Sequence, residues 1–144
     1  MENNFNNFYT IYTDGGSRGN PGHAGAGGVI FDNDKKVVAE ISQYLGIQTN
    51  NYAEYKALLL TLKRVVELGI NNKIIDVYMD SLLVVNQLNG KWKVKHNNII
   101  PLYNEIKELL KSFTNITFTH ILRNNNKHAD SLANKAMDLA QMLL

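Results

Sequence analysis

Four acidic residues stand apart from the other acids of this sequence, in positions where carboxylates could perform chemistry together. Most of the 13 acidic residues lie beside lysines in surface-like helical segments such as NEIKELLK. Asp14, in contrast, follows a run of β-forming residues and precedes two glycines, and Asp80 follows the similar run VYM. Glu54 and Asp130 lie in the first turns of two predicted helices. These four acids are therefore the candidate functional residues.

Glu54 shares a helical face with Leu58 and Val65, so its carboxylate is predicted to turn toward the core, where a charge is costly unless it is compensated. Taken singly, each helix-start acid also fits a capping box or the helix dipole. Taken together, strand ends and helix starts of an α/β protein converge on one edge of the sheet. Carboxylates gathered there would repel one another unless cations lay between them.

The chemistry of such a cluster is that of hard divalent cations. Mg²⁺, and also Mn²⁺, prefers carboxylate oxygens and water. Two such ions about 4 Å apart are the usual arrangement for in-line displacement at phosphorus. The four acids therefore predict phosphodiester hydrolysis.

The segments that must position these acids predict the element order βββαβααβα. The first three strands are expected to be antiparallel, because their connections are short, with turn residues at 31–36. Later strands that follow helices are expected to lie parallel to an earlier one. The fold class is therefore α/β, a mixed five-stranded sheet flanked by helices. Strands are predicted at residues 8–12, 26–31, 36–44, 73–79 and 116–121, and helices at 51–68, 81–88, 99–113 and 127–144.

The composition of the chain limits its domain organisation, its cellular location and its partners. A chain of 144 residues that is 44% hydrophobic predicts one domain over residues 1–144, with residues 1–7 expected to be disordered. The lack of cysteine excludes disulfides and thiolate metal sites and suits a reducing compartment. No secretory signal and no apolar run of about 18 residues is present, so we expect a cytoplasmic protein without a membrane partner. The net charge of +2 is too small to identify a nucleic-acid binder.

Four segments carry a resemblance to a known family: YTDGGSRGNPGHAGAGGVIF, QTNNYAEYKALLLTL, VYMDSLLVVNQLNGKWKVK and HILRNNNKHADSLANKAM. In this order, spread from about Tyr9 to Met137, they resemble type 1 ribonuclease H. The resemblance implies that Asp14, Glu54, Asp80 and Asp130 are the metal-binding catalytic residues. It also implies cleavage of the RNA strand of an RNA–DNA hybrid with two metal ions, leaving 5′-phosphate and 3′-hydroxyl ends, as in the removal of RNA primers and R-loops.

The same resemblance implies a set of substrate contacts. RNA is distinguished from DNA through its 2′-hydroxyl, which is best reached from the wide minor groove of an A-like duplex. The TNN stretch also fits plain helix capping, and both roles are compatible because helix N–H groups attract phosphate. Thr49 matches a position that meets the DNA-strand phosphate. The residues that match groove or other substrate-contact positions are Gly15, Gly16, Ser17, Asn20, Asn50, Asn51 and Ser81.

The segment GKWKVKH places Trp92 among three lysines. In an extended chain the lysines would share one side and Trp92 the other, which suits contact with phosphates and with sugars or bases. The resemblance favours this binding role, although a core tryptophan beside solvated lysines is the alternative. Longer family members carry a basic insertion here, whereas this chain passes directly to the helix predicted at 99–113.

Two residues ahead of Asp130 are further candidates by resemblance. His120 matches a mobile-loop histidine proposed to assist proton transfer or product release, but the alternation in ITFTH places it at a strand end. A His-x-x-Arg pattern in other members makes Arg123 the second candidate near the scissile phosphate.

Other functions fit the sequence less well than hybrid cleavage. A non-catalytic nucleic-acid-binding module on the same fold remains the main alternative, and a resolvase or transposase-like domain is another. GHAGAGG lacks the G-x-G-x-x-G pattern and precedes a strand, which excludes dinucleotide binding, and a glycosidase needs only two acids. The starting Met and the final helix favour a free-standing protein over a reverse-transcriptase domain, and we expect a monomer.

Overall fold

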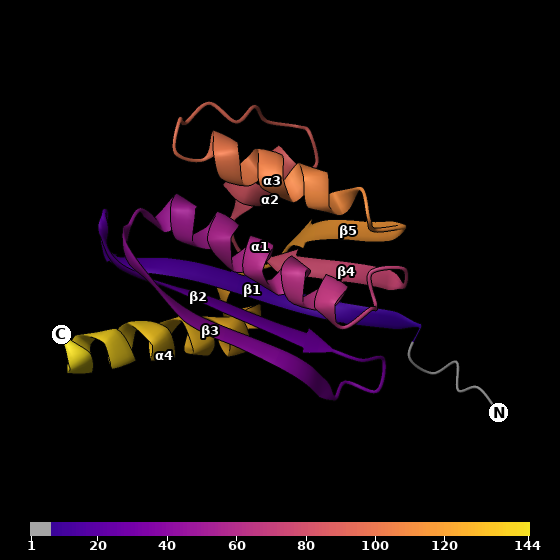
Figure 1. Cartoon of the computed structure of the whole chain (residues 1–144), viewed down its shortest axis with the longest axis horizontal. Helices are drawn as coiled ribbons and strands as arrows, with labels where there is room; N and C mark the ends of the chain where they lie inside the picture. Colours follow the sequence, from indigo (N-terminus) through magenta and orange to yellow (C-terminus); the bar gives the residue numbers. More distant parts are fainter. Residues whose placement is uncertain (1–6) are drawn as a thin grey trace.

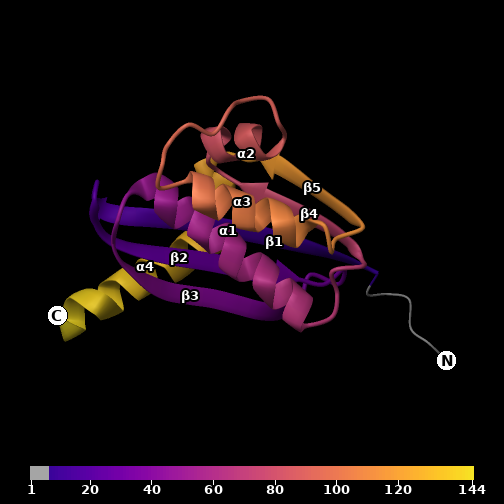
Figure 2. The same ribbon diagram turned by 45° about the horizontal axis from the view of Figure 1, so that its top comes forward.

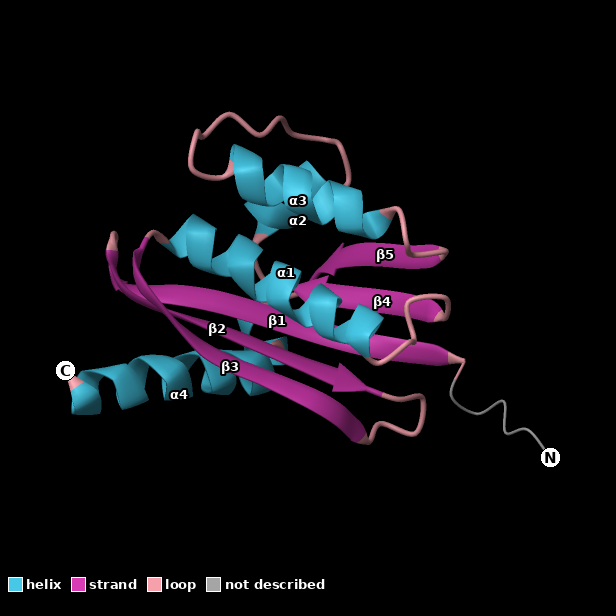
Figure 3. Cartoon of the chain, in the orientation of Figure 1, coloured by secondary structure: helices cyan, strands magenta, loops and turns pink. Residues whose placement is uncertain are grey.

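In the computed structural model, which describes residues 7–144, five strands form one mixed sheet (Figures 1 and 3). The strand order is β3-β2-β1-β4-β5, with β1–β2 and β2–β3 antiparallel and β1–β4 and β4–β5 parallel. This confirms the predicted fold class. Of residues 1–7, which were expected to be disordered, residues 1–6 lie outside the described residues. The elements are β1 (Phe8–Gly19), β2 (Gly22–Phe31), β3 (Val37–Gln48), α1 (Asn50–Glu67), β4 (Ile74–Met79), α2 (Leu82–Leu88), α3 (Ile100–Leu110), β5 (Asn115–His120), a 3-10 turn (Arg123–Asn125) and α4 (Lys127–Leu143).

The first strand is much longer than its sequence pattern predicted. β1 continues to Gly19, because its antiparallel pairing with β2 runs on from Asp14 opposite Gly27 to Gly19 opposite Gly22. The predicted end of this strand at residue 12 is therefore wrong. Hydrogen bonds to β2 hold this polar, glycine-rich segment in extended form even though its residues are poor β-formers.

The helices cover opposite faces of the sheet. In Figures 1 and 2, α1, α2 and α3 lie on one face and α4 lies on the other. α4 approaches β2 so closely that a Cβ on Gly27 would lie 2.2 Å from the carbonyl oxygen of Ala129, so this position requires glycine. Within residues 7–144, no helix combines the length and apolar character that a membrane span needs.

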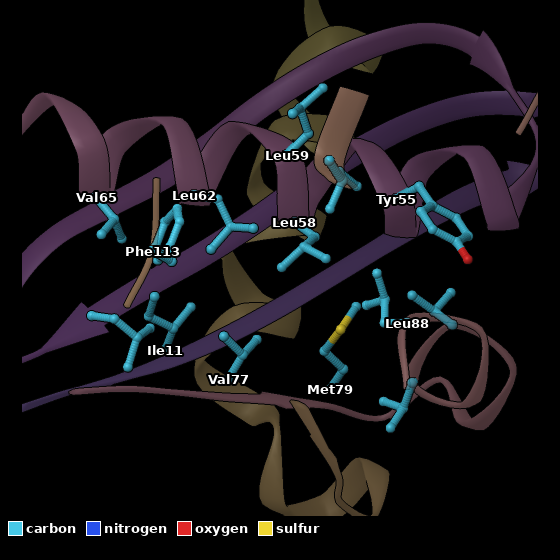
Figure 4. Close-up of a cluster of buried hydrophobic side chains, with 14 of the residues drawn as sticks. Ile11, Tyr55, Leu58, Leu59, Leu62, Val65, Val77, Met79, Leu88 and Phe113 are labelled. Atoms are coloured by element: carbon cyan, nitrogen blue, oxygen red, sulfur yellow. The ribbon is translucent and has the colours of Figure 1, made fainter. Parts of the chain in front are cut away.

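The main core lies between α1 and the sheet (Figure 4). Leu58, Leu62 and Val65 of α1 are fully buried against strand residues such as Ile11 and Val77. The predicted inward positions of Leu58 and Val65 are thus confirmed, whereas Leu68, which the helical period also predicts on this face, is 41% exposed. Because this face is fixed against β1 and β4, Glu54 near the start of α1 is fixed relative to Asp14 within β1 and to the end of β4.

Candidate active site

The site forms where β4 ends beside β1. The parallel pairing of the two strands stops at Thr13 opposite Met79, and the next residue of each chain segment is an aspartate, Asp14 or Asp80. Within residues 7–144, β1 continues beyond this point with β2 as its only strand neighbour. The edge of β1 is therefore free of a strand partner here, so side chains from both faces of the sheet can meet around it.

The four predicted carboxylates come together at this point from four elements. Asp14, Glu54 and Asp80 each offer a carboxylate oxygen, and these oxygens lie within 4.8 Å of one another. All three side chains are partly buried. Asp130, in the first turn of α4, lies close enough to Asp14 that its carboxylate contributes to the raised pKa of Asp14. The predicted convergence on one sheet edge is present, with Asp130 outside the tight group of three.

The electrostatics of the cluster favour a cation. Burial is the largest cause that raises the pKa of Asp14 to about 8, and the negative charge of Asp80 is the next. Burial also raises the pKa of Glu54 to about 7, against the opposing effects of a hydrogen bond from Ser81 and the charge of Arg123. Carboxylates that repel one another in a partly buried site are the donor set that divalent cations prefer. The residues present therefore fit Mg²⁺ or Mn²⁺.

Asn126 is a residue of the site that sequence reasoning missed. Its buried side-chain NH₂ group donates to the carbonyl oxygen of Thr13 at 2.9 Å and to Asp80 Oδ2 at 3.3 Å. The backbone N–H of Asp130 donates to the carbonyl oxygen of Asn126 at 3.1 Å. Asn126 thus connects the middle of β1, the end of β4 and the start of α4. Its position four residues before Asp130 is the sequence signal that could have indicated it.

A second missed residue, Asn134, lies four residues after Asp130 on the same face of α4. Its side-chain NH₂ group donates to Asp130 Oδ2 at 3.1 Å. The spacing of four on both sides of Asp130 is visible in the sequence as NKHADSLAN, but amides at this spacing are common on helix surfaces. The hydrogen bond from Asn134 to Asp130, and not the spacing alone, identifies Asn134 as a residue of the site.

The remaining catalytic candidates lie beside the cluster. His120 is the last residue of β5 and is paired with Met79, so it occupies a strand end as the alternation predicted. Arg123 begins the 3-10 turn, and its charge lowers the pKa of Glu54, which places it on the Glu54 side. Ser81 is the N-cap of α2 and also hydrogen-bonds Glu54.

Several predicted substrate residues hold the tip of the β1–β2 hairpin against the start of α1. The backbone N–H of Ser17 donates to Asn50 Oδ1 at 2.9 Å, and the backbone N–H of Asn50 donates to Asn20 Oδ1 at 3.2 Å. Thr49 is the N-cap of α1 and accepts a hydrogen bond from the backbone N–H of Tyr52. The capping reading of TNN is confirmed for Thr49, and Asn51 is left exposed.

Gly15 and Gly16 differ in what they contact. A Cβ on Gly15 would lie 2.2 Å from the backbone carbonyl of Ala53, so Gly15 is required for the packing of β1 against α1. A Cβ on Gly16 would meet only Met137 Cε at 3.6 Å, an ordinary contact on the α4 face. The structure therefore gives Gly15 a packing role that the sequence did not reveal.

Two adjoining pockets are lined by most of the other residues that were predicted to contact the substrate. The smaller, of about 270 Å³, is lined by Asn20, Thr49, Asn50, Asn51, His96, Asn98 and Ile99. The larger, of about 580 Å³, includes Asn51, His96 and Ile99 as well, together with Trp92 and three lysines. Trp92 is 47% exposed, so the core-tryptophan alternative is wrong. Gly15, Gly16 and Ser81 do not line either pocket.

Comparison with known proteins agrees with this geometry. The family model described as "Reverse transcriptase-like" matches residues 12–136. The N-terminal RNase H domain of Rv2228c from Mycobacterium tuberculosis superposes with a TM-score of 0.86 at 45% identity, over 90% of this chain and 98% of that domain structure. The chain belongs to the ribonuclease H family. A ribonuclease H fold thus carries the carboxylate cluster.

Two further relatives of this chain also carry ribonuclease H names. Ribonuclease HI of Halobacterium salinarum is 40% identical over 125 residues, 87% of this chain and 62% of that protein. LC11-RNase H1, isolated from compost by a metagenomic approach and solved in complex with an RNA/DNA hybrid, has a TM-score of 0.88 at 40% identity, over 92% and 99% of the two chains.

The chain corresponds to only part of some family members. It matches the full-length bifunctional protein Rv2228c at 47% identity over 128 residues, which are 88% of this chain and 35% of that protein. The connection between α2 and α3, residues 89–99, passes directly into α3 without an added helix, as the sequence predicted for a short family member.

Proposed function

We propose that this protein is a ribonuclease H that hydrolyses the RNA strand of RNA–DNA hybrids. The observation that carries the proposal is the meeting of Asp14, Glu54 and Asp80, whose carboxylate oxygens lie within 4.8 Å of one another, with Asp130 beside Asp14. A non-catalytic binding module would gain nothing from four carboxylates facing a phosphate backbone, since they would repel it. The relative that was solved with an RNA/DNA hybrid supports the choice of substrate.

The four acids would hold two divalent ions when substrate is bound, Mg²⁺ or Mn²⁺. When bound, these ions would stabilise the attacking and leaving oxygens of an in-line displacement at phosphorus. Asp14 faces the site from within β1 and Asp80 from the end of the adjacent β4, while Glu54 and Asp130 reach it from helices on opposite faces of the sheet. A cation would lower the pKa values of Asp14 and Glu54 and so keep their carboxylates ionised.

The reaction that we propose consumes one water for each bond that is cleaved. The water oxygen forms a bond to phosphorus, the bond from phosphorus to the 3′-oxygen breaks, and that oxygen takes up a proton. The products carry 5′-phosphate and 3′-hydroxyl ends. His120 and Arg123 are the candidates to assist, because they lie at the end of β5 and in the 3-10 turn beside Glu54.

The substrate-binding part of the proposal rests on the two pockets. Thr49 at the start of α1 would meet a DNA-strand phosphate, where exposed helix N–H groups also attract anions. Asn50, Asn51 and Asn20 would lie along the minor groove, where the 2′-hydroxyl distinguishes RNA. Trp92 and its neighbouring lysines would contact sugar, base and phosphate farther along the duplex.

The cellular setting is also a proposal. The cluster is complete within one chain, which supports action as a monomer. The cysteine-free sequence supports a reducing compartment, for which the cytoplasm is the proposed location. Hybrids in such a compartment arise as RNA primers and R-loops, and their removal is the proposed role.

One cleavage assay tests the proposal. The protein is incubated with labelled RNA–DNA hybrid, double-stranded RNA or double-stranded DNA, with Mg²⁺ or Mn²⁺ supplied in turn. We expect cleavage only in the RNA strand of the hybrid. Binding of the hybrid in a gel shift without cleavage in either metal would instead identify a binding module.

The matched variant is Asp80→Asn, which keeps the shape of the side chain and removes its charge. We expect cleavage to fall by at least about 10³-fold, because a metal ligand is lost, while the circular dichroism spectrum stays that of the wild type. An Asp80→Asn protein that cleaves at the wild-type rate would contradict the carboxylate assignment.

A further inference from the structure

Asp130 is held differently from the other three acids. It lies outside the group whose oxygens fall within 4.8 Å, and it projects from α4 rather than from the sheet edge or α1. Among the described residues, its carboxylate accepts one side-chain hydrogen bond, from Asn134 Nδ2 to Oδ2 at 3.1 Å. Asn134 is therefore the side-chain donor to this carboxylate.

Arg18 fixes the orientation of the Asn134 amide. Arg18 Nη2 donates to Asn134 Oδ1 at 3.3 Å. Because a guanidinium has donors and no acceptor, the amide oxygen must face Arg18, and the amide NH₂ group is left to face Asp130. The two hydrogen bonds thus give the Asn134 side chain one orientation.

Arg18 is itself anchored on α4. Its Nη1 lies 2.7 Å from Asp138 Oδ1 and also donates to the side chain of Gln141. Its side chain is 33% exposed, although Arg18 lies near the tip of the β1–β2 hairpin. A continuous chain of contacts therefore runs from this hairpin through Asn134 to Asp130.

We propose that Asn134 is a positioning residue for Asp130, with Arg18 as its outer anchor. By donating to Oδ2, the amide holds the Asp130 carboxylate in one rotamer and leaves Oδ1 available to a divalent cation. The inference rests on the proposed function, because it assigns Asn134 a part in the same metal site. Hydrogen-bonded partners of metal ligands commonly change metal affinity or activity by about 10- to 100-fold when they are removed.

The variants that test this are Asn134→Ala, which removes the donor, and Asn134→Asp, which replaces the donor with an acceptor of nearly the same shape. Alanine is a better helix former than asparagine, so Asn134→Ala is expected to fold. For Asn134→Ala we expect kcat to fall about 10-fold while KM for the hybrid changes less than about 2-fold. Asn134→Asp should lose at least as much, since its carboxylate repels Asp130. Arg18→Ala should show a smaller loss in the same direction.

Two further measurements separate positioning from a merely structural role. Calorimetric titration with Mn²⁺ in the absence of hybrid should show affinity reduced about 10-fold in Asn134→Ala and unchanged in Ser131→Ala, a control whose hydroxyl contacts only the His128 carbonyl. In an Asp130→Asn background, adding Asn134→Ala should lower kcat no further, because both changes act through one carboxylate.

The outcomes are distinguishable from those of the proposed function. Wild-type Mn²⁺ affinity and wild-type kcat in Asn134→Ala would overturn the positioning role, as would additive losses in the Asp130→Asn background. A wild-type protein that binds Mn²⁺ without cleaving the hybrid would overturn the ribonuclease proposal, and reduced Mn²⁺ affinity in Asn134→Ala would then still support the role of Asn134.

Discussion

The protonation of two acids links metal binding, pH and stability. Asp14 and Glu54 have raised pKa values, to about 8 and about 7, because they are partly buried beside other carboxylates. In the unfolded chain both groups ionise near pH 4. Between pH 4 and about 8 the metal-free folded protein therefore binds more protons than the unfolded chain.

From this difference we predict that the metal-free protein loses stability as pH rises from 5 to 8. The sign follows because stability falls with pH wherever the folded state holds the extra protons, by about 1.4 kcal/mol per pH unit for each such proton. Mg²⁺ requires the ionised carboxylates, so its affinity should rise over the same interval. Urea unfolding at several pH values, with and without Mg²⁺, measures both effects.

The Asp14→Asn variant is the matched control, because an amide does not titrate in this range. Its stability should depend less steeply on pH than that of the wild type. Equal stability of the metal-free wild-type protein at pH 5 and pH 8 would contradict the assignment of raised pKa values to this cluster.

At the scale of elements, the site depends on how closely β1 and α1 approach each other. Asp14 belongs to the sheet and Glu54 to the helical layer that packs on it, and the contact between the strand and the helix backbone at Gly15 sets the distance between them. The four-residue pattern that makes α1 a helix gives no information about this distance. It is fixed by the lack of a side chain at one strand position.

We predict that Gly15→Ala and Gly16→Ala differ sharply in stability. The added Cβ of Gly15→Ala would lie 2.2 Å from the backbone of Ala53, and we expect a loss of at least about 3 kcal/mol or failure to fold. The Cβ of Gly16→Ala would lie 3.6 Å from Met137 Cε, and we expect a change within about 1 kcal/mol. Midpoints of urea unfolding measure both, and similar midpoints for the two variants would show that β1 and α1 can separate at little cost.

At the scale of the whole molecule, charge placement matters more than the net charge of +2. Three exposed lysines, Lys91, Lys93 and Lys95, line one pocket with Trp92, while the carboxylates lie at the end of β4. Under the proposed function, the lysine segment would attract the phosphate backbone that the acids repel. Hybrid affinity would then depend on this segment more than on the overall charge.

We predict that replacing the three lysines with alanine weakens hybrid binding and reduces its salt dependence. Each phosphate contact contributes about 0.9 to the slope of log affinity against log salt, so the slope should decrease by up to about 3. Fluorescence anisotropy at several salt concentrations measures this, with the Asp80→Asn background used to prevent cleavage.

The control for this experiment removes the same charge elsewhere. Lys36, Lys111 and Lys135 are exposed and line neither substrate pocket. Their triple alanine variant should keep the wild-type slope within about 1 unit, since long-range effects of surface charges are screened. Equal slope changes in the two triple variants would show that only net charge matters.

The sequence by itself determined the order of the helices and strands and which side of α1 packs against the sheet. It also singled out the four acids that meet at the site. Hydrophobic periodicity is a local property, so it distinguishes a helix such as α1 from a strand such as β5 without knowledge of the partners. The position of Asp80 after an apolar strand and of Glu54 on an apolar helix face was enough to single them out, because acids at such positions are costly unless they have a function.

Only the tertiary structure decided how β1 extends past Asp14, why Gly15 must be glycine, and which amides hold the acids. Pairing with β2 overrides the weak strand propensity of the GGS segment, and packing against α1 is a contact between residues far apart in the chain. Asn126 and Asn134 look like ordinary helix residues until their amides are seen to donate to Asp80 and Asp130. The physical reason is that hydrogen bonds and close backbone contacts depend on three-dimensional distances, which local sequence patterns do not encode.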